Sequence, residues 1–475
     1  MNKAAIYHHC GDQWCYALDP DTLHIRLRTA ANDIDSLEIV CADPYEYCFD
    51  DGKPAWKSAA YPMVKSGTNG VHDFWEFRFQ PPYKRLKYWF LLHKGKKSWE
   101  FGEKGLVDTV DMMNVWNAFI FPYIQPKEVF RAPDWVSETV WYQIFPDRFN
   151  SSTPGDSAPG IKEWQYGPVT NQELYGGDLA GITAKLDHIA SIGFNGIYLT
   201  PIFKSPSNHK YNTADYLTID PAFGTEDDLR TLVAECHARG IRIILDAVFN
   251  HAGTEFAPWK DVVEHGEKSR YRDWFVINRF PLYTEEQQAA YDRKEWRRAD
   301  DSHESGYSTF AFTNSMPKFN TTNPEAREYL LGVAEHYIRK FDIDGWRLDV
   351  ANEVDHEFWR QFRIRVKSAK PDAFIVGEIW HHSMDWLRGD QYDAIMNYHF
   401  GQAICKFLLA DPEIPHSRAL ANQLTTLEMS YPEPVIRAGF NLMDSHDTDR
   451  LITRLGDNVN AARQAWLLFA LLPAA

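Results

Sequence analysis

Short apolar segments alternate with longer amphipathic segments from Val140 onward, and no other feature constrains the fold of this chain as strongly. An apolar run that is bounded by turn residues and followed by an amphipathic stretch of helix length is typical of a strand–helix unit. Repetition of this unit predicts a parallel sheet covered by helices. The predicted strands are residues 140–145, 196–200, 241–246, 345–349, 374–378, 394–397 and 438–443. These seven strands are one fewer than a closed (β/α)8 barrel requires.

The first 125 residues have a different pattern. Residues 23–28, 36–40 and 72–79 alternate apolar and polar side chains with the period of half-buried strands. Turn-forming residues separate them, which predicts an all-β sandwich. We therefore expect a β-sandwich domain at 1–125, followed by an α/β barrel. Its first part covers 126–253, an excursion after the third strand covers 254–322, and the remainder covers 323–475.

Charge and cysteine content exclude several classes of protein. Asp and Glu number 66 against 50 Lys and Arg, which gives a formal charge of −16. A chain this acidic lacks the basic surface that nucleic acid or an anionic membrane requires. Six cysteines without a CxxC pair argue against a zinc knuckle and indicate mostly reduced thiols. The amino terminus lacks the apolar core of a signal peptide, so we expect a cytoplasmic protein. Aromatic residues make up 15% of the chain, which fits either stacking on sugars or a large aromatic core.

Arg347 and Asp349 lie two residues apart at the end of the fourth predicted strand. Residues with this spacing point to the same face of a strand, so their side chains should lie next to each other. A guanidinium beside a carboxylate favours the ionised carboxylate. An ionised and oriented carboxylate is the nucleophile of a retaining glycosidase. A structural ion pair would produce the same pattern, so the motif alone leaves both interpretations open.

Other polar residues follow the ends of neighbouring predicted strands. The third strand runs into Asp246 and His251, the fifth ends at Glu378, and residues 444–450 after the seventh are rich in Asp and His. A barrel carries its chemistry at the carboxyl ends of its strands. The coincidence at four strands favours a catalytic site over unrelated ion pairs.

These four segments resemble the signature regions of the α-amylase family of glycoside hydrolases. A fifth segment, Met-Pro-Lys-Phe-Asn at 316–320, is similar to the motif of the neopullulanase, cyclomaltodextrinase and maltogenic amylase subgroup. The resemblance implies a catalytic (β/α)8 TIM barrel preceded by a β-sandwich domain of the carbohydrate-binding or dimerisation type. It also implies retaining hydrolysis of α-1,4 bonds in cyclodextrins, maltooligosaccharides, pullulan or starch, with transfer to sugar acceptors as a side reaction and no organic cofactor. A homodimer is expected, with the amino-terminal domain of one subunit covering the cleft of its partner.

The resemblance assigns three catalytic carboxyl groups. Asp349 would be the nucleophile, Glu378 the acid and then the base, and Asp447 the group that grips sugar hydroxyls at the transition state. The two reacting carboxyls of a retaining enzyme are expected roughly 5–5.5 Å apart. The residues expected to bind or line the substrate are Tyr211, His251, Arg347, His446, Glu353 and Trp380. Glu353 and Trp380 are expected on the leaving-group side, and Asp215 and Asp246 are expected to orient neighbouring side chains.

A calcium site is also implied by the resemblance. The matching positions are Asn150, Ser152, Asp156, Gly176 and Asp178. Calcium prefers several carboxylate or carbonyl oxygens, and Ser152 stands where the subgroup more usually has Asn or Asp. The alternative is that these are polar turn residues and a helix cap.

The sequence ends before the eighth strand and the β-rich carboxyl-terminal domain that the family has, so both are expected to be missing. A catalytically inactive α-glucan-binding protein is therefore the alternative from another functional class. A glycosyl-transferring amylase or an α-1,6 hydrolase is the alternative among enzymes.

Overall fold

A computed structural model describes the chain except for residues 111–115, 154–159, 164–168, 171–172, 294–302 and 473–475. The chain divides into two compact units. The first unit comprises Met1–Ala132, Trp380–Asp390 and Asn397–Ala474, and the second comprises Pro133–Ile379 and Gln391–Met396.

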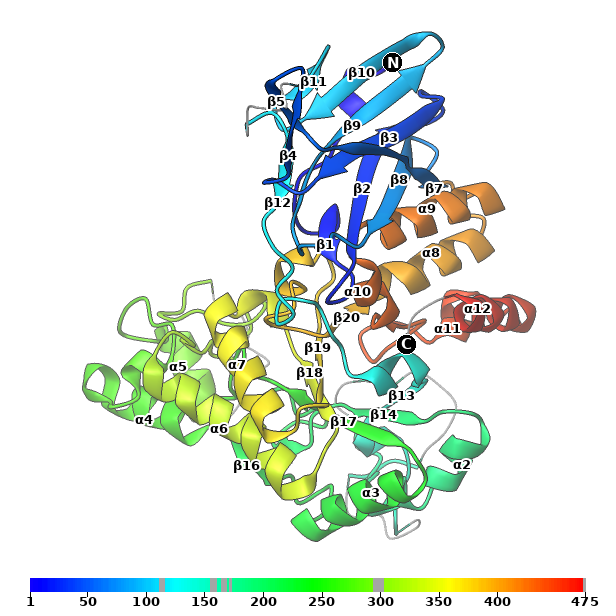
Figure 1. Ribbon diagram of the computed structural model, residues 1–475. Helices are drawn as coiled ribbons and strands as arrows, with labels where there is room; N and C mark the ends of the chain where they lie inside the picture. Colours follow the sequence, from blue (N-terminus) through cyan, green and yellow to red (C-terminus); the bar gives the residue numbers. More distant parts are fainter. Residues whose placement is uncertain (111–115, 154–159, 164–168, 171–172, 294–302, 473–475) are drawn as a thin grey trace. The chain divides into compact units, whose positions relative to one another are not determined.

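Two antiparallel sheets form the β-sandwich of the first unit, which confirms the predicted amino-terminal fold (Figure 1). One sheet has the order β1-β2-β8-β7, with bounds Cys15–Ala17, Leu23–Ala30, His72–Phe79 and Val64–Thr68. The other has the order β11-β10-β9-β3-β6, with bounds Gly105–Val107, Lys97–Gly102, Leu86–Lys94, Ser36–Ala42 and Ala59–Pro62. Strand β12 (Phe119–Phe121) pairs with β9, and β4 (Tyr47–Asp50) forms a hairpin with β5 (Lys53–Trp56).

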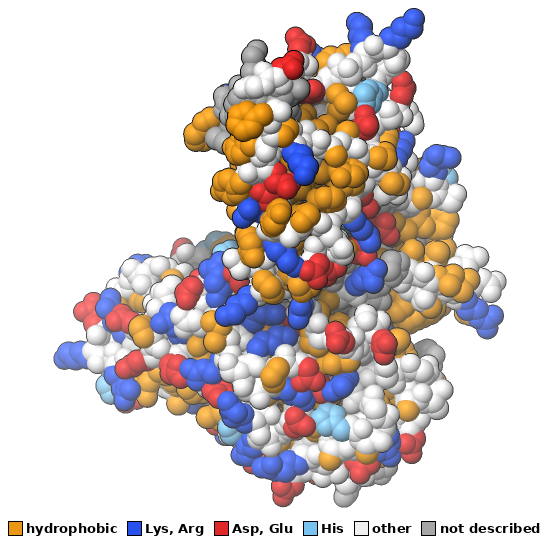
Figure 2. Space-filling model, viewed as in Figure 1, with side chains coloured by type: hydrophobic (Ala, Val, Ile, Leu, Met, Phe, Trp, Pro, Cys, Tyr) orange, Lys and Arg blue, Asp and Glu red, His pale blue; other side chains and the backbone are white. Residues whose placement is uncertain are grey.

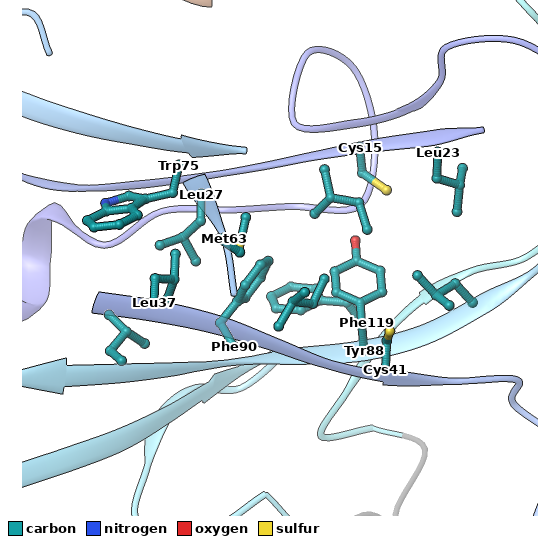
Figure 3. Packing of buried hydrophobic residues seen from close by; sticks show 14 of the residues in the cluster. Cys15, Leu23, Leu27, Leu37, Cys41, Met63, Trp75, Tyr88, Phe90 and Phe119 are labelled. Carbon is teal, nitrogen blue, oxygen red and sulfur yellow. The ribbon is translucent and has the colours of Figure 1, made fainter. Parts of the chain in front are cut away.

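Side chains from both sheets meet in the sandwich core. Leu27 and Trp75 on one sheet face Leu37 and Phe90 on the other, and all four are buried (Figure 3). Strand β3 alternates buried and partly exposed residues along its length, as a sheet with one buried face requires. The sandwich therefore has a hydrophobic core of its own.

The first unit also contains β21 (Phe440–Asn441) and helices α8 (Tyr398–Leu408), α9 (Ser417–Met429), α10 (Glu433–Arg437), α11 (Leu451–Arg454) and α12 (Val459–Leu471). Helix α9 packs against β7 of the sandwich. Strand β21 is the short form of the strand predicted at 438–443. All six cysteines are free thiols.

The second unit is built on parallel strands in the order β13-β14-β17-β18-β19-β20 (Figure 1). Their bounds are Trp141–Ile144, Gly196–Leu199, Arg242–Ala247, Gly345–Leu348, Phe374–Gly377 and Ala394–Asn397. Each lies within two residues of its predicted strand at either end. Every residue of β14, β18 and β19 is buried, as expected for strands covered on both faces. The parallel sheet confirms the α/β barrel class.

Helices connect these strands: α1 (Leu179–Thr183), α2 (Leu186–Ser191), α3 (Glu226–Ala238), α6 (Pro324–Phe341) and α7 (His356–Ala369). Local sequence fixes where the longer ones begin. Thr225 and Asp228 form a capping box at α3, Asn323 caps α6 ahead of Pro324, and Asp355 caps α7. Helix α6 packs beside α3 and α7 (Figure 1).

The excursion between β17 and α6 contains α4 (Ala257–His265) and α5 (Glu285–Asp292). A small two-stranded sheet of β15 (Phe203–Lys204) and β16 (Asp215–Ile219) lies earlier, between β14 and α3. None of the helices in the described ranges is both long and apolar enough to cross a membrane.

Candidate active site

The register of β17, β18 and β19 places two of the three predicted catalytic residues, Asp349 and Glu378, at one level. Asp246 pairs with Arg347, and Leu348 pairs with Gly377. The next residues continue the ladder, because the Asp349 N–H donates to Ala247 O at 3.1 Å and the Glu378 N–H donates to Leu348 O at 2.9 Å. The side chains therefore emerge together at the carboxyl ends of adjacent parallel strands.

Arg347 joins three carboxyl groups in this cluster, and its side chain is only 1% exposed. Nη1 donates to Asp349 Oδ1 at 2.8 Å and to both carboxylate oxygens of Asp246 at 3.0 Å. Nη2 lies 2.9 Å from Glu378 Oε2. A planar guanidinium holds several acceptors in fixed directions. We call Arg347, Asp246, Asp349 and Glu378 the Arg347 cluster.

Two buried atoms beside this cluster carry no hydrogen bond from any described residue: Asp349 Oδ2 and His251 Nε2. Buried polar atoms are almost always paired, so unpaired ones in a site need a reason. The other oxygen of Asp349 is held by Arg347, which orients the carboxyl group and leaves Oδ2 available. The His251 ring is stacked on Phe310, with centroids 5.1 Å apart and an interplanar angle of 10°.

Electrostatics in the cluster differ from the expectation based on the Arg347–Asp349 pair alone. Burial raises the pKa of Asp349 well above its usual range, and the charges of Glu378 and Asp246 raise it further, while Arg347 lowers it. Arg347 favours the ionised carboxylate, as expected, but burial and the two neighbouring carboxylates act against it. One guanidinium is shared among three buried carboxyl groups, so the cluster favours retaining a proton.

The backbone after Asp349 is strained. Val350 is β-branched and adopts the left-handed conformation with φ 46° and ψ 44°, which such residues rarely do. Its N–H donates to Glu378 Oε2 at 2.9 Å. The strained turn therefore places a backbone donor on the second reacting carboxyl group.

Tyr211 and Tyr198 both donate their hydroxyls to Asp246 Oδ2, at 2.8 and 2.5 Å. Burial raises the pKa of both phenols far above their usual range, so they remain protonated donors. Asp246 thus orients Arg347 and Tyr211 together, in the supporting position expected from the sequence. Asp215 instead supports its own turn, accepting from Leu217 N at 3.0 Å and Thr218 Oγ1 at 2.7 Å.

His251 is held as a neutral imidazole. Burial and the nearby Lys318 charge lower its pKa to about 3. A neutral ring can exchange hydrogen bonds with a sugar hydroxyl without adding a positive charge to the site.

Sequence reasoning did not identify Lys318, Tyr198 or Phe310 as functional residues. Lys318 was noticed only as the third letter of a motif, and its ammonium lies 3.0 Å from Glu353 Oε2. The sequence signals were the motif at 316–320 for Lys318 and, for Tyr198, a position two residues before the end of a predicted strand.

Asp447, His446 and Trp380 lie together in the first unit. Asp447 Oδ2 accepts from the Tyr398 hydroxyl at 3.3 Å, and Asp447 Oδ1 lies 3.3 Å from His446 Nε2. Trp380 stacks on the Tyr398 ring with centroids 3.6 Å apart and an interplanar angle of 12°. The Trp380 side chain is nevertheless 46% exposed, which leaves surface for a ligand.

The residues expected to bind calcium are tied together by protein hydrogen bonds. Asp178 caps α1, accepting from Gly181 N at 2.5 Å and from Ser152 N and Oγ at 3.0 and 2.8 Å. Asn150 O accepts the Asp178 N–H at 3.1 Å, and the Gly176 N–H donates to the Asp147 carboxyl at 3.2 Å. Asp156 lies outside the described residues.

These hydrogen bonds match the alternative interpretation, in which the residues form polar turns and a helix cap. Asp178 is the one carboxylate among the described members of the calcium set, so this set by itself fits a calcium ion poorly. In the described residues, no three His, Cys, Asp or Glu side chains are grouped to hold a metal ion.

Comparison with known proteins gives consistent results for both parts of the chain. A family model described as "Alpha amylase, catalytic domain" matches residues 143–474, and one described as "Alpha amylase, N-terminal ig-like domain" matches residues 1–125. A cyclomaltodextrinase of Geobacillus thermopakistaniensis (strain MAS1) is 48% identical over 99% of this chain and 75% of its own length.

Two further similarities extend over nearly the whole chain. The intracellular maltogenic amylase of Bacillus subtilis (strain 168) is 44% identical over 98% of this chain and 75% of its own length. A solved cyclomaltodextrinase structure superimposes with a TM-score of 0.90 at 40% identity, covering 100% of this chain and 77% of that one.

Proposed function

Because the chain belongs to the alpha-amylase family, we propose that it hydrolyses α-1,4 glucosidic bonds in cyclodextrins, maltooligosaccharides or pullulan with retention of configuration. Asp349 Oδ2 is the observation that carries this proposal. It is buried and unpaired among the described residues, and the Arg347 guanidinium that orients it also contacts Glu378. A nucleophile and an acid held on one guanidinium suit a double displacement.

In the first step, Asp349 Oδ2 forms a bond to the anomeric carbon as the bond to the leaving oxygen breaks. Glu378 transfers its proton to that oxygen, so the leaving sugar departs neutral. In the second step, Glu378 removes a proton from water, the water oxygen attacks the anomeric carbon, and the Asp349 carboxylate is released. A sugar hydroxyl in place of water gives transfer.

The surrounding residues have supporting roles in this scheme. Arg347 and Asp246 keep Asp349 in one orientation, and His251 Nε2 is available to a substrate hydroxyl. Tyr211 offers a flat ring whose hydroxyl is fixed by Asp246. Asp447 and His446 would bind sugar hydroxyls.

β-Cyclodextrin hydrolysis by this chain, compared with Asp349→Asn and with products resolved by chromatography, tests the proposal. Maltose release by the parent and its loss in the variant are expected. A parent that unfolds cooperatively but releases no product would contradict hydrolysis and leave the inactive glucan-binding alternative. The family membership and the unpaired nucleophile disfavour that alternative.

We also propose a cytoplasmic homodimer that uses the sandwich domain. Six free thiols suit a reducing compartment, and a relative at 44% identity is named intracellular. Hydrophobic side chains gather on the visible face of the sandwich domain (Figure 2). In the same domain, Tyr45 and Phe49 are 69% and 76% exposed. Exposed rings of this kind mark contact surfaces. Light scattering should give twice the mass of the chain, and a monomer would contradict the dimer.

Calcium binding near Asp178 stays a proposal of its own. Asn150 and Asp178 supply oxygens, and Asp156 would add a second carboxylate. Millimolar calcium should raise the melting temperature of the parent relative to a chelator, and Asp178→Ala should abolish the difference. An equal melting temperature in calcium and chelator would refute binding, and Asp178→Ala would then cost only the helix cap, about 1 kcal/mol.

A further inference from the structure

The segment 316–320 is attached by its backbone to the loop that follows β17. The Phe319 N–H donates to Asn250 O at 3.0 Å, and the Ala252 N–H donates to Pro317 O at 3.0 Å. His251 and Lys318 face each other in this antiparallel bridge. The bridge fixes the backbone of Lys318 beside the catalytic loop, so the reach of its side chain is determined by the fold.

The Lys318 ammonium binds three oxygens from two loops. It donates to Glu353 Oε2 at 3.0 Å, to the Glu353 backbone carbonyl at 3.1 Å, and to the Asn250 side-chain oxygen. These contacts use all three donors of an ammonium. Asn250 Nδ2 also approaches Glu353 Oε2, at 3.4 Å. The exits of β17 and β18 are thereby joined through one side chain.

This contact differs from an ordinary surface ion pair. Most exposed pairs contribute little because both side chains move freely. Here the Lys318 side chain is 21% exposed and is held at three points, whereas Glu353 is 41% exposed. Glu353 therefore presents its carboxylate to the solvent side from a fixed position, which is what recognition of a sugar hydroxyl requires.

We propose that Lys318 is a positioning residue that holds Glu353 for the sugar on the leaving-group side, and so controls which leaving groups and acceptors react. The inference rests on the proposed function, because Glu353 is assigned to that side only as part of it. The leaving sugar and the acceptor sugar occupy the same place in the two half-reactions. Loss of Lys318 therefore weakens both expulsion of a sugar and transfer to a sugar. It spares an aryl leaving group, which lacks the hydroxyls that Glu353 would bind.

Lys318→Met tests this by removing the charge and keeping the apolar stem. With maltotriose, kcat/KM should fall by about tenfold or more, as for loss of a hydrogen bond to a charged group. Transfer to added glucose should fall relative to hydrolysis. Release of p-nitrophenol from p-nitrophenyl α-maltoside should stay within about twofold. Lys318→Arg keeps the charge and should restore most of the maltotriose activity.

Glu353→Gln provides a second route, because the side chain is 41% exposed and its replacement by an amide of the same size should cost little stability. Glu353→Gln should also lower kcat/KM for maltotriose and spare p-nitrophenyl α-maltoside. The double variant should lose no more maltotriose activity than Glu353→Gln alone. Lys340→Met is the matched control, since Lys340 on α6 pairs with Glu226 of α3 at 2.7 Å, and among the described residues it forms no ion pair with a site residue. This control should change neither the ratio of maltotriose to aryl maltoside activity nor the ratio of transfer to hydrolysis.

The outcomes separate the two hypotheses. If the parent cleaves none of these substrates, the proposed function fails. If the parent is active but Lys318→Met or Glu353→Gln lowers maltotriose and aryl maltoside activity equally, Lys318 is only a structural clamp and the inference is overturned. The inference is also overturned if the fold-loss of maltotriose activity in the double variant equals the product of the fold-losses in the two single variants. The melting temperature of each variant shows whether it is folded. If Lys318→Met does not fold, the comparison of the parent with Glu353→Gln decides the test.

Discussion

Two aspartates at opposite ends of β18 should separate stability from catalysis. Asp344 precedes the first residue of the strand, and Asp349 follows the last. In a barrel, the amino-terminal ends of strands serve stability and the carboxyl-terminal ends serve chemistry. Replacement of each by Asn tests whether this chain obeys that division.

Asp344 is fully buried and binds four donors. His237 Nε2 lies at 2.8 Å, Arg242 Nη1 and Lys370 Nζ each lie at 3.0 Å, and the Ile243 N–H lies at 2.9 Å. Burial alone would raise the pKa of this carboxyl group. The hydrogen bond from His237 and the Lys370 charge outweigh burial and lower the pKa to about 2.

The contribution of Asp344 to the free energy of unfolding follows from that shift in pKa. The pKa of Asp344 falls from 3.8 to about 2 on folding, and one pKa unit corresponds to about 1.4 kcal/mol. The ionised carboxylate therefore adds roughly 2 kcal/mol to the free energy of unfolding at neutral pH. Asp344→Asn should lose at least this amount and leave kcat within about twofold, because no reacting group is touched.

The sign of the pH dependence is fixed by the direction of the shift. A carboxyl group whose pKa is lowered on folding stabilises the protein above its unfolded pKa, and the contribution is lost as pH falls through the folded value. The difference between the parent and Asp344→Asn should be constant above about pH 5 and shrink between about pH 4 and pH 2.

Asp349→Asn should behave in the opposite way. Because folding raises the pKa of Asp349, its ionised form destabilises the fold above the unfolded pKa, and Asn removes that cost. We expect equal or greater stability at neutral pH and a loss of kcat of at least about a thousandfold.

Urea unfolding followed by circular dichroism, together with β-cyclodextrin turnover, measures both effects. A variant at Asp344 that is as stable as the parent at neutral pH would refute the electrostatic argument. So would a stability difference that persists undiminished to about pH 2. A destabilised Asp349→Asn would show that the carboxylate is there to hold the fold.

Three further predictions follow from single contacts. Asp246→Asn removes a charge that, besides burial, raises the pKa of Asp349, so the acid limb of the kcat/KM profile should move to lower pH; an unmoved limb would contradict this coupling. Tyr211→Phe loses the 2.8 Å bond to Asp246 and should lower kcat/KM by about tenfold, while an unchanged value would make the hydroxyl irrelevant. Gly377→Ala brings a Cβ within 2.6 Å of a tyrosine ring and should cost about 1–3 kcal/mol in urea unfolding, whereas Gly332→Ala, in open space on α6, should gain about 1 kcal/mol.

Much of the fold could be predicted because its signals are local. Strand positions follow from short apolar runs, and helix starts follow from caps such as Thr225 and Asn323. The family resemblance rested on motifs at strand ends and is confirmed by the family models. The strand predicted at 438–443 was too long, since only Phe440 and Asn441 form strand β21.

The sequence by itself determined which carboxyl groups and imidazoles stand at the ends of strands, because strand ends and residue spacing are written along the chain. Only the tertiary structure decided that Arg347 serves Asp246, Asp349 and Glu378 at once, since Asp246 lies 101 residues away. That sharing, together with burial, raises the pKa of Asp349, whereas the Arg347–Asp349 pair alone would lower it. The partners of a charged group, and how deeply they are buried, depend on which strands become neighbours, and neither property can be read from spacing along the chain.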